Sequence, residues 1–164
     1  MDKTKLRLII LTALIASICV IGSFIKVPVG IVGTAALDSA PALISAIFLP
    51  PVFAGAAGAL GHIATGLTSG FPLGILHLLI AVEMFIIVAV FAMMHQKGQH
   101  ILKWIFVIVA NGVIAPIPFY FIISPAFYIG SIASLTIATA VNCLIAIIVM
   151  PVLKKVVQQA GVNV

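Results

Sequence analysis

Charged side chains are scarce in this sequence of 164 residues. Asp, Glu, Lys and Arg make up 7% of it and hydrophobic residues make up 64%, whereas an ordinary soluble domain is about 25% charged. This composition excludes a water-soluble globular domain. We therefore expect an all-α, multi-pass protein of the prokaryotic cytoplasmic membrane, with residues 1–164 forming a single membrane domain.

The motifs of common enzyme classes are also missing. The sequence has no Walker A lysine loop, no HExxH, no GxSxG and no carboxylate pair at metal-ligand spacing. The only cysteines, Cys19 and Cys143, lie in apolar segments without metal-ligand spacing, which is typical of small core residues. We therefore expect no catalytic residues, no metal site and no cofactor in this chain.

Long apolar runs are what the sequence does contain. A helix needs about 20 apolar residues to cross the hydrocarbon core of a bilayer. We predict six transmembrane helices, at residues 6–25, 39–49, 52–67, 73–94, 104–122 and 131–153. The second is shorter than usual and meets the third at Pro50 and Pro51, and a single broken re-entrant element is the alternative.

Lysine and arginine are unevenly distributed along the chain. Seven of the eight lie at the N-terminus, in the segment 95–103 and near the C-terminus, and only Lys26 lies elsewhere. Cytoplasmic ends of membrane helices carry an excess of these residues. Four predicted crossings separate the first two groups and two separate the last two, so both termini are predicted to be cytoplasmic.

Small residues recur at helical spacing in two of the predicted helices. Gly55, Gly58 and Gly61 give the third helix a thin face that a neighbouring helix can approach closely. Ala13 and Ser17 lie four residues apart, and therefore on one face of the first helix. This second pair fits helix packing inside the subunit as well as contact with another protein.

Two of the three carboxylates and two of the four histidines fall between residues 36 and 83. An acid costs on the order of 3 kcal/mol near the middle of a membrane, so Glu83 indicates a polar pocket between helices. His62, Thr65 and Ser69 follow helical spacing along one side of the third helix. Glu83 can alternatively pair with His62 as a structural bridge.

A ligand pocket in the outer half of the membrane is the favoured interpretation of these residues. The side chains predicted to contact the ligand are Asp38, His62, Thr65, Ser69, Phe71, His77, Glu83 and Asn111. Asp38 can alternatively cap a helix, and His77 can be solvated near the interface. Asn111 and Asn142 are equally suited to hydrogen bonds between helices.

These features together resemble the S components of energy-coupling factor (ECF) vitamin transporters. The resemblance rests on six short helices, basic cytoplasmic ends, the small pair on the first helix, and the run LDSAP…GALGHIATGLTSGFPLGILHLLIAVE. This run is most similar to the subgroup assigned to α-ribazole, a precursor of cobalamin. The resemblance implies a substrate-binding subunit that takes a small vitamin-like solute from outside the cell.

The resemblance also implies partners and a way of working. S components act with a transmembrane coupling subunit and two ATPase subunits, which use the ATP. The family's Ala-xxx-Ala pattern, which meets the coupling subunit, is matched by Ala13 and Ser17, with serine as a departure from it. A riboside would then pack against aromatic residues such as Phe71 and Tyr128. From the residues alone, a self-sufficient proton-coupled carrier or channel is the alternative, because a Glu and a His in the membrane can relay protons.

Overall fold

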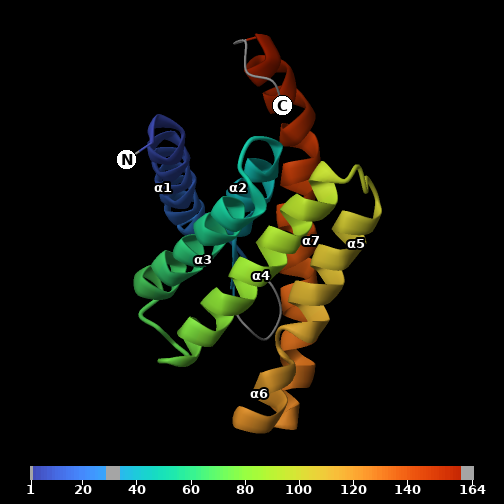
Figure 1. Cartoon of the computed structure of the whole chain (residues 1–164). Helices are drawn as coiled ribbons and strands as arrows, with labels where there is room; N and C mark the ends of the chain where they lie inside the picture. Colours follow the sequence, from blue (N-terminus) through green and yellow to red (C-terminus); the bar gives the residue numbers. More distant parts are fainter. Residues whose placement is uncertain (1, 29–33, 160–164) are drawn as a thin grey trace.

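The computed structural model describes residues 2–28 and 34–159, and helices dominate this part of the chain (Figure 1). The helical elements are α1 (Lys3–Ser23), α2 (Ser39–Ile44), the 3-10 turn η1 (Ser45–Ile47), α3 (Pro51–Thr68), α4 (Leu76–Gln96), α5 (Leu102–Val109), the π-helical turn η2 (Ala110–Ile114), α6 (Ile117–Ile122) and α7 (Pro125–Gln159). Two short strands, β1 (Lys26–Pro28) and β2 (Thr34–Ala36), pair antiparallel between α1 and α2. The prediction of a helical protein is confirmed, with this hairpin as the one departure among the described residues.

Within the described residues, four helical segments are long and apolar enough to cross a membrane. They are Lys3–Ser23, Leu76–Gln96, Leu102–Ile122 and Pro125–Gln159. The predicted second crossing is a short element, because α2 has 6 residues and η1 has 3 before the chain reaches Pro50 and Pro51. The multi-pass membrane character is confirmed, and six crossings stay a prediction.

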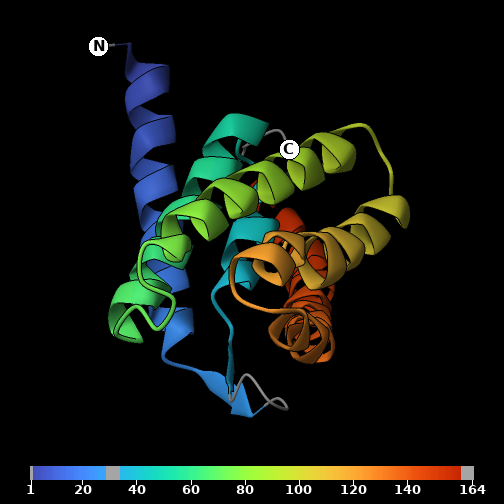
Figure 2. The same cartoon turned by 90° about the horizontal axis from the view of Figure 1, so that it is seen from below.

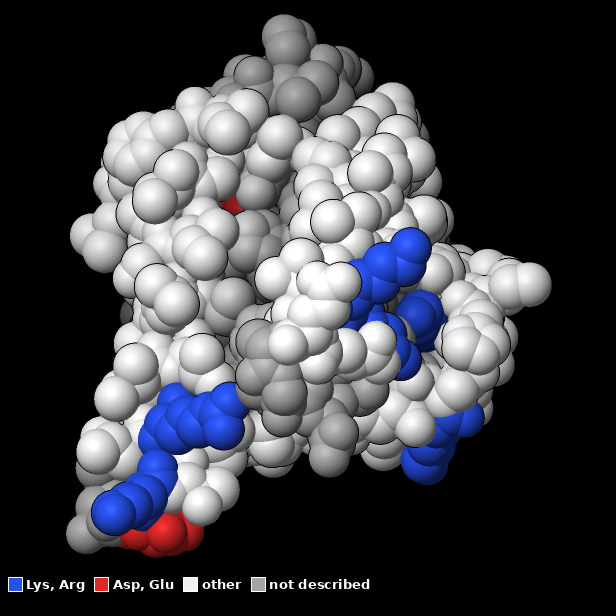
Figure 3. Space-filling model, turned by 90° about the horizontal axis from the view of Figure 1, so that it is seen from above, with Lys and Arg blue, Asp and Glu red and all other residues white. Residues whose placement is uncertain are grey.

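The two ends of the described chain lie at the same end of the molecule as the α4–α5 connection (Figure 1). The α3–α4 and α6–α7 connections lie at the opposite end. When the molecule is viewed from the end that holds the termini, Lys and Arg side chains form two groups separated by uncharged surface (Figure 3). This arrangement agrees with the predicted cytoplasmic position of the termini, which stays a prediction.

α2 lies in the middle of the helix bundle (Figure 2). It contacts α1, α3, α4 and α7, although the chain reaches it through the hairpin at the edge of the molecule. Its residues Ala40, Ala42 and Leu43 are buried in the core. A short central helix therefore brings its first turn into the interior, next to long helices that surround it.

The glycine-rich face of α3 is packed against its neighbours as the spacing predicts. A Cβ atom added at Gly55 would lie 2.6 Å from the backbone oxygen of Phe85 on α4, and one added at Gly61 would lie 2.6 Å from the Cβ of Cys19 on α1. Both distances are shorter than van der Waals contact allows. Cys19 and Cys143 are free and buried, which confirms their prediction as core residues.

The fifth predicted helix is not a single α-helix. It is divided into α5, η2 and α6, and in η2 the backbone N–H of Ala115 donates to the carbonyl of Ala110 at 2.7 Å. Pro116 and Pro118 have no N–H to continue the α-helical pattern, and a proline ring also displaces the carbonyl four residues earlier. The wider π turn accommodates this change within one membrane span.

The predicted helix boundaries that differ from the structure include the starts of α7 and α4. α7 begins at Pro125 rather than at residue 131, because the Ser124 hydroxyl accepts the N–H of Phe127 at 3.1 Å and proline is tolerated in a first helical turn. α4 begins at Leu76 rather than at residue 73. Gly74, between the predicted and the observed start, has φ +54°, which a right-handed helix does not permit.

Candidate functional site

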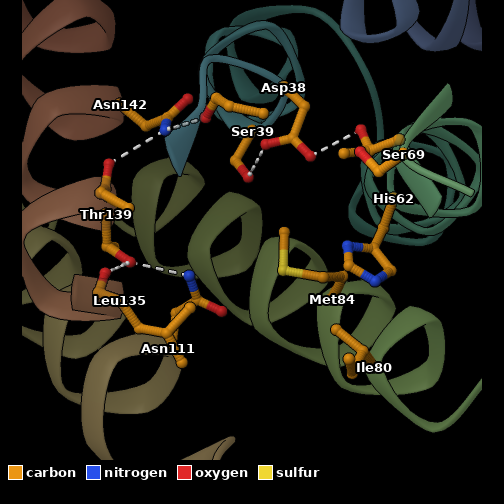
Figure 4. A pocket seen from close by; sticks show the side chains of 13 residues that line it. Asp38, Ser39, His62, Ser69, Ile80, Met84, Asn111, Leu135, Thr139 and Asn142 are labelled. Carbon is orange, nitrogen blue, oxygen red and sulfur yellow. Dashed lines mark hydrogen bonds between the residues drawn. The ribbon is translucent and has the colours of Figure 1, made fainter. Parts of the chain in front are cut away.

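A cavity of about 180 Å³ is lined by residues near the end of α3 and the start of α4, in the half of the molecule nearer the α3–α4 and α6–α7 connections (Figure 1). We call it the Asp38 cavity (Figure 4). Its polar lining residues are Asp38, Ser39, His62, Thr65, Ser69, Asn111, Thr139 and Asn142. Its other lining residues are Ala36, Ile80, Met84, Leu135 and Ala138. The cavity is therefore built from the β2–α2 junction, α3, α4, η2 and α7, which are distant in sequence.

Asp38 forms the centre of the polar wall. Its carboxylate accepts a hydrogen bond from the Thr65 hydroxyl on α3 at 2.7 Å and another from the Ser39 hydroxyl at 3.1 Å. Asp38 precedes α2, yet its side chain makes no capping hydrogen bond to that helix. The capping role considered from the sequence is therefore wrong, and the carboxylate instead joins the first turn of α2 to α3.

Asn142 binds the other side of the same junction. Its side-chain oxygen accepts the N–H of Ala40 at 2.8 Å, and its amide nitrogen donates to the carbonyls of Ala36 and Ala138 at 3.0 Å each. Asn142 is only 3% exposed. Its amide thus satisfies backbone groups on both sides of Asp38, so it is an interhelical hydrogen-bonding residue that also lines the cavity.

Asn111 lies on η2 and faces α7. Its amide nitrogen donates to the Thr139 hydroxyl at 2.7 Å, and that hydroxyl donates to the carbonyl of Leu135 at 2.7 Å. The residue therefore combines the two roles that the sequence left open. It connects two helices, and it lies on the cavity wall.

His62 reaches the cavity from α3 and is backed by a second histidine. Its Nε2 shares a hydrogen bond of 3.1 Å with Nδ1 of His77. His77 is 7% exposed, and the edge of the Phe71 ring lies against it with ring centroids 5.3 Å apart. Phe71 and His77 therefore pack behind His62 and do not line the cavity themselves. Because His77 is buried, the solvated position considered for it from the sequence is wrong.

Glu83 is half-buried on α4 and is not among the residues that line the Asp38 cavity. Its Oε2 atom is buried and has no hydrogen-bond partner in the described part of the chain. The bridge to His62 considered from the sequence is not formed, since His62 bonds to His77. Glu83 follows the lining residue Ile80 by three positions, so its role in ligand binding stays a prediction.

The structure brings five of the eight predicted ligand contacts to one cavity, namely Asp38, His62, Thr65, Ser69 and Asn111. Sequence reasoning did not include Ser39, Thr139 or Asn142 among those contacts. The expected aromatic floor is also absent from the described lining. Tyr128 packs on Tyr120, and its hydroxyl points to the carbonyl of Val113 at 3.4 Å.

Ala13 and Ser17 lie together on an exposed face of α1. The Ser17 hydroxyl donates to the Ala13 carbonyl at 2.9 Å. This bond satisfies the hydroxyl within the helix, so serine presents a small surface much as alanine would. The departure from the alanine pattern therefore leaves this face suited to close approach by another helix.

Comparison with known proteins assigns this architecture to a family. Residues 7–160 match the family model described as ECF transporter, substrate-specific component. The chain belongs to this family. No curated protein and no solved structure matches it significantly. As an S component, it is a multi-pass membrane subunit that binds a small substrate for an ECF importer, together with a transmembrane component and ATPases.

Proposed function

We propose that this S component binds a neutral heteroaromatic riboside, α-ribazole or a related cobalamin precursor, in the Asp38 cavity. The observation that supports this most is the mixed character of the cavity lining. It combines a carboxylate, amides and hydroxyls with the apolar side chains of Ile80, Met84 and Leu135. Ribose hydroxyls would donate to Asp38 and bond to Asn111, while the flat ring would pack on the apolar side chains.

The charge of the lining favours a neutral ligand over an anionic one. Asp38 is the only acidic residue among the described lining residues, and they include no Lys or Arg. A ligand with its own carboxylate, such as pantothenate, would meet Asp38 without a compensating cation. Burial of such unpaired like charges is costly in a membrane interior.

The volume of the cavity sets a further condition. Its 180 Å³ is below the roughly 300 Å³ at the lower limit of pockets for drug-sized ligands. A riboside would therefore require side chains to move when it binds. Met84 is suited to this movement because it is unbranched and adapts its shape easily.

We also propose that the subunit crosses the membrane six times with both termini in the cytoplasm, with α2 as a half-length crossing. The grouping of Lys and Arg at one end of the molecule supports this orientation (Figure 3). The Asp38 cavity would then lie in the outer half of the membrane. Substrate would enter from outside and be released inward by the complex with the coupling subunit and ATPases.

Reconstituted transport tests this function against the proton-coupled alternative. Proteoliposomes that contain this subunit, the coupling subunit and the ATPases should take up labelled α-ribazole only when ATP is supplied. The subunit alone should show no uptake under a proton gradient. Uptake by the subunit alone that disappears when the gradient is collapsed would favour the alternative, and ATP-driven uptake of other compounds but not α-ribazole would contradict the substrate.

A further inference from the structure

A group of basic side chains lies at the end of the molecule opposite the Asp38 cavity. It contains His95 on the last turn of α4, His100 in the α4–α5 connection, Lys103 on α5 and Lys154 on α7, and we call it the His95 cluster. The basic side chains of Lys103, Lys154 and His100 all lie near enough to His95 to act on it electrostatically. The α4–α5 connection, α5 and α7 therefore bring basic side chains toward the end of α4.

Lys103 is the fixed member of the His95 cluster. It is only 5% exposed, and its Nζ lies 2.6 Å from Nδ1 of His95. The ammonium also lies 5.0 Å from the ring centroid of Trp104 and 5.6 Å from that of Phe91, within the range of cation–π contacts. An ammonium has three N–H donors, and His95 accepts one of them. The other two are therefore left for another acceptor.

The side chains of the chain supply no carboxylate for this cluster. Asp2 accepts the N–H of Thr4 at the start of α1, and Asp38 is bonded inside its cavity. Glu83 lies 12 residues before His95 on α4, which is about 18 Å along a helix. In Figure 3, acidic side chains lie beside one group of Lys and Arg, and none is visible beside the other.

We propose that the His95 cluster binds the phosphate of an anionic phospholipid. Charge complementarity favours a phosphate, since the ammonium groups of Lys103 and Lys154 lie in this cluster without an acidic side chain. The surroundings favour a lipid as its source, because Ile101, Leu102 and Val152, which are near Lys103 and Lys154 in sequence, are exposed apolar side chains that acyl chains can cover. Basic sites between membrane helices at the cytoplasmic side are suited to acidic lipid headgroups.

Native mass spectrometry of the full-length subunit in detergent tests this site. Phosphatidylglycerol should bind in preference to phosphatidylcholine, which carries a phosphate but no net charge. Lys154→Gln should weaken phosphatidylglycerol binding about fivefold, as expected for one basic residue near a membrane surface. The matched control is Lys155→Gln, which removes the same charge from an exposed neighbouring position outside the cluster.

Folding of each variant is checked by its elution profile and its thermal unfolding. Lys103→Met keeps most of the apolar stem of the side chain. If this variant elutes as the wild type does, it should lose the preference for phosphatidylglycerol. If it aggregates, the comparison of Lys154→Gln with Lys155→Gln tests the proposal instead. Equal binding of the two lipids, or equal losses in Lys154→Gln and Lys155→Gln, would overturn the proposal. Equal thermal stabilisation by inorganic phosphate and by the lipid would also overturn the proposal. A Lys154→Gln subunit that binds the lipid normally but fails to assemble with the ECF partners would overturn it as well.

Discussion

At the scale of single residues, Asp38 and Asn142 hold the first turn of α2 from two sides. Asp38 accepts from Thr65 on α3, and Asn142 on α7 bonds to backbone groups of Ala36 and Ala40. The same side chains line the cavity. A ligand that exchanges one of these hydrogen bonds for its own would therefore change how α2 is held, which couples binding to the packing of the bundle.

The hydroxyl of Thr65 should matter for ligand affinity. Thr65→Val removes the donor that positions Asp38, so α-ribazole should bind more weakly, by at most the roughly 1.5–3 kcal/mol that a hydrogen bond to a charged group is worth. Titration calorimetry measures the change. Thr68→Val is the matched control, because the Thr68 hydroxyl bonds to Ser23 and to the Thr65 carbonyl instead. Equal losses in both variants would argue against a specific role for Asp38.

Asn142 should be more important for stability than Asn111. Asn142→Leu leaves the N–H of Ala40 and the carbonyl of Ala36 unsatisfied, at a cost of about 1–3 kcal/mol for each buried group. Asn111→Leu removes one bond to Thr139, whose hydroxyl keeps its bond to the Leu135 carbonyl. Thermal unfolding in detergent should show a larger decrease in Tm for Asn142→Leu. Similar decreases would contradict the assignment of Asn142 as the main support of α2.

At the scale of elements, the local patterns of the sequence predicted some features well and others poorly. The long apolar helices were predictable because length and hydropathy alone define them. His62, Thr65 and Ser69 could be placed on one face because they share one helix and its spacing. Asn142 lies more than 100 residues from the backbone groups of Ala36 and Ala40 that it bonds, so no local pattern connected it to Asp38.

The start of α7 and the division of the fifth predicted helix were predicted wrongly for a common physical reason. Ser124 and Pro125 are frequent in loops, and here the serine caps a helix that starts at the proline. The π turn at Ala110–Ile114 depends on how the chain adapts to two prolines, which helix periodicity does not describe. In both places the residues permit two local structures, and packing against neighbouring helices selects one of them.

The close contact between α3 and α4 should tolerate no added side chain at Gly55. In Gly55→Ala the new Cβ would lie 2.6 Å from the Phe85 backbone oxygen, so the helices must separate. We expect destabilisation of about 1–3 kcal/mol, as for other overpacked sites, and a lower Tm in detergent. Leu60→Ala, on an exposed position of the same helix, should change the Tm much less. A Gly55→Ala protein as stable as the wild type would contradict this packing.

At the scale of the whole molecule, the polarity of the protein is divided between its two ends. Basic side chains gather at the end with both termini, and the Asp38 cavity lies in the other half. Few charges lie between these regions, which lowers the cost of reorienting the bundle within a membrane. This division suits a subunit that receives substrate on one side and meets its partners on the other.

The orientation can be tested by cysteine labelling in intact cells. In a background where Cys19 and Cys143 are replaced by alanine, a membrane-impermeant maleimide should label Pro72→Cys in the α3–α4 connection. It should not label Gln99→Cys in the α4–α5 connection until the cells are opened. The reverse pattern would place the termini outside and would contradict the proposed topology.

The central claim is that the Asp38 cavity binds a riboside without help from the other subunits. Calorimetry of the purified subunit, without ATP or partners, against α-ribazole, cobalamin, pantothenate, hydroxymethylpyrimidine and thiamin tests it most directly. We predict that α-ribazole binds most tightly and that Asp38→Asn weakens this binding. Tighter binding of pantothenate or thiamin, or α-ribazole affinity unchanged by Asp38→Asn, would contradict the account.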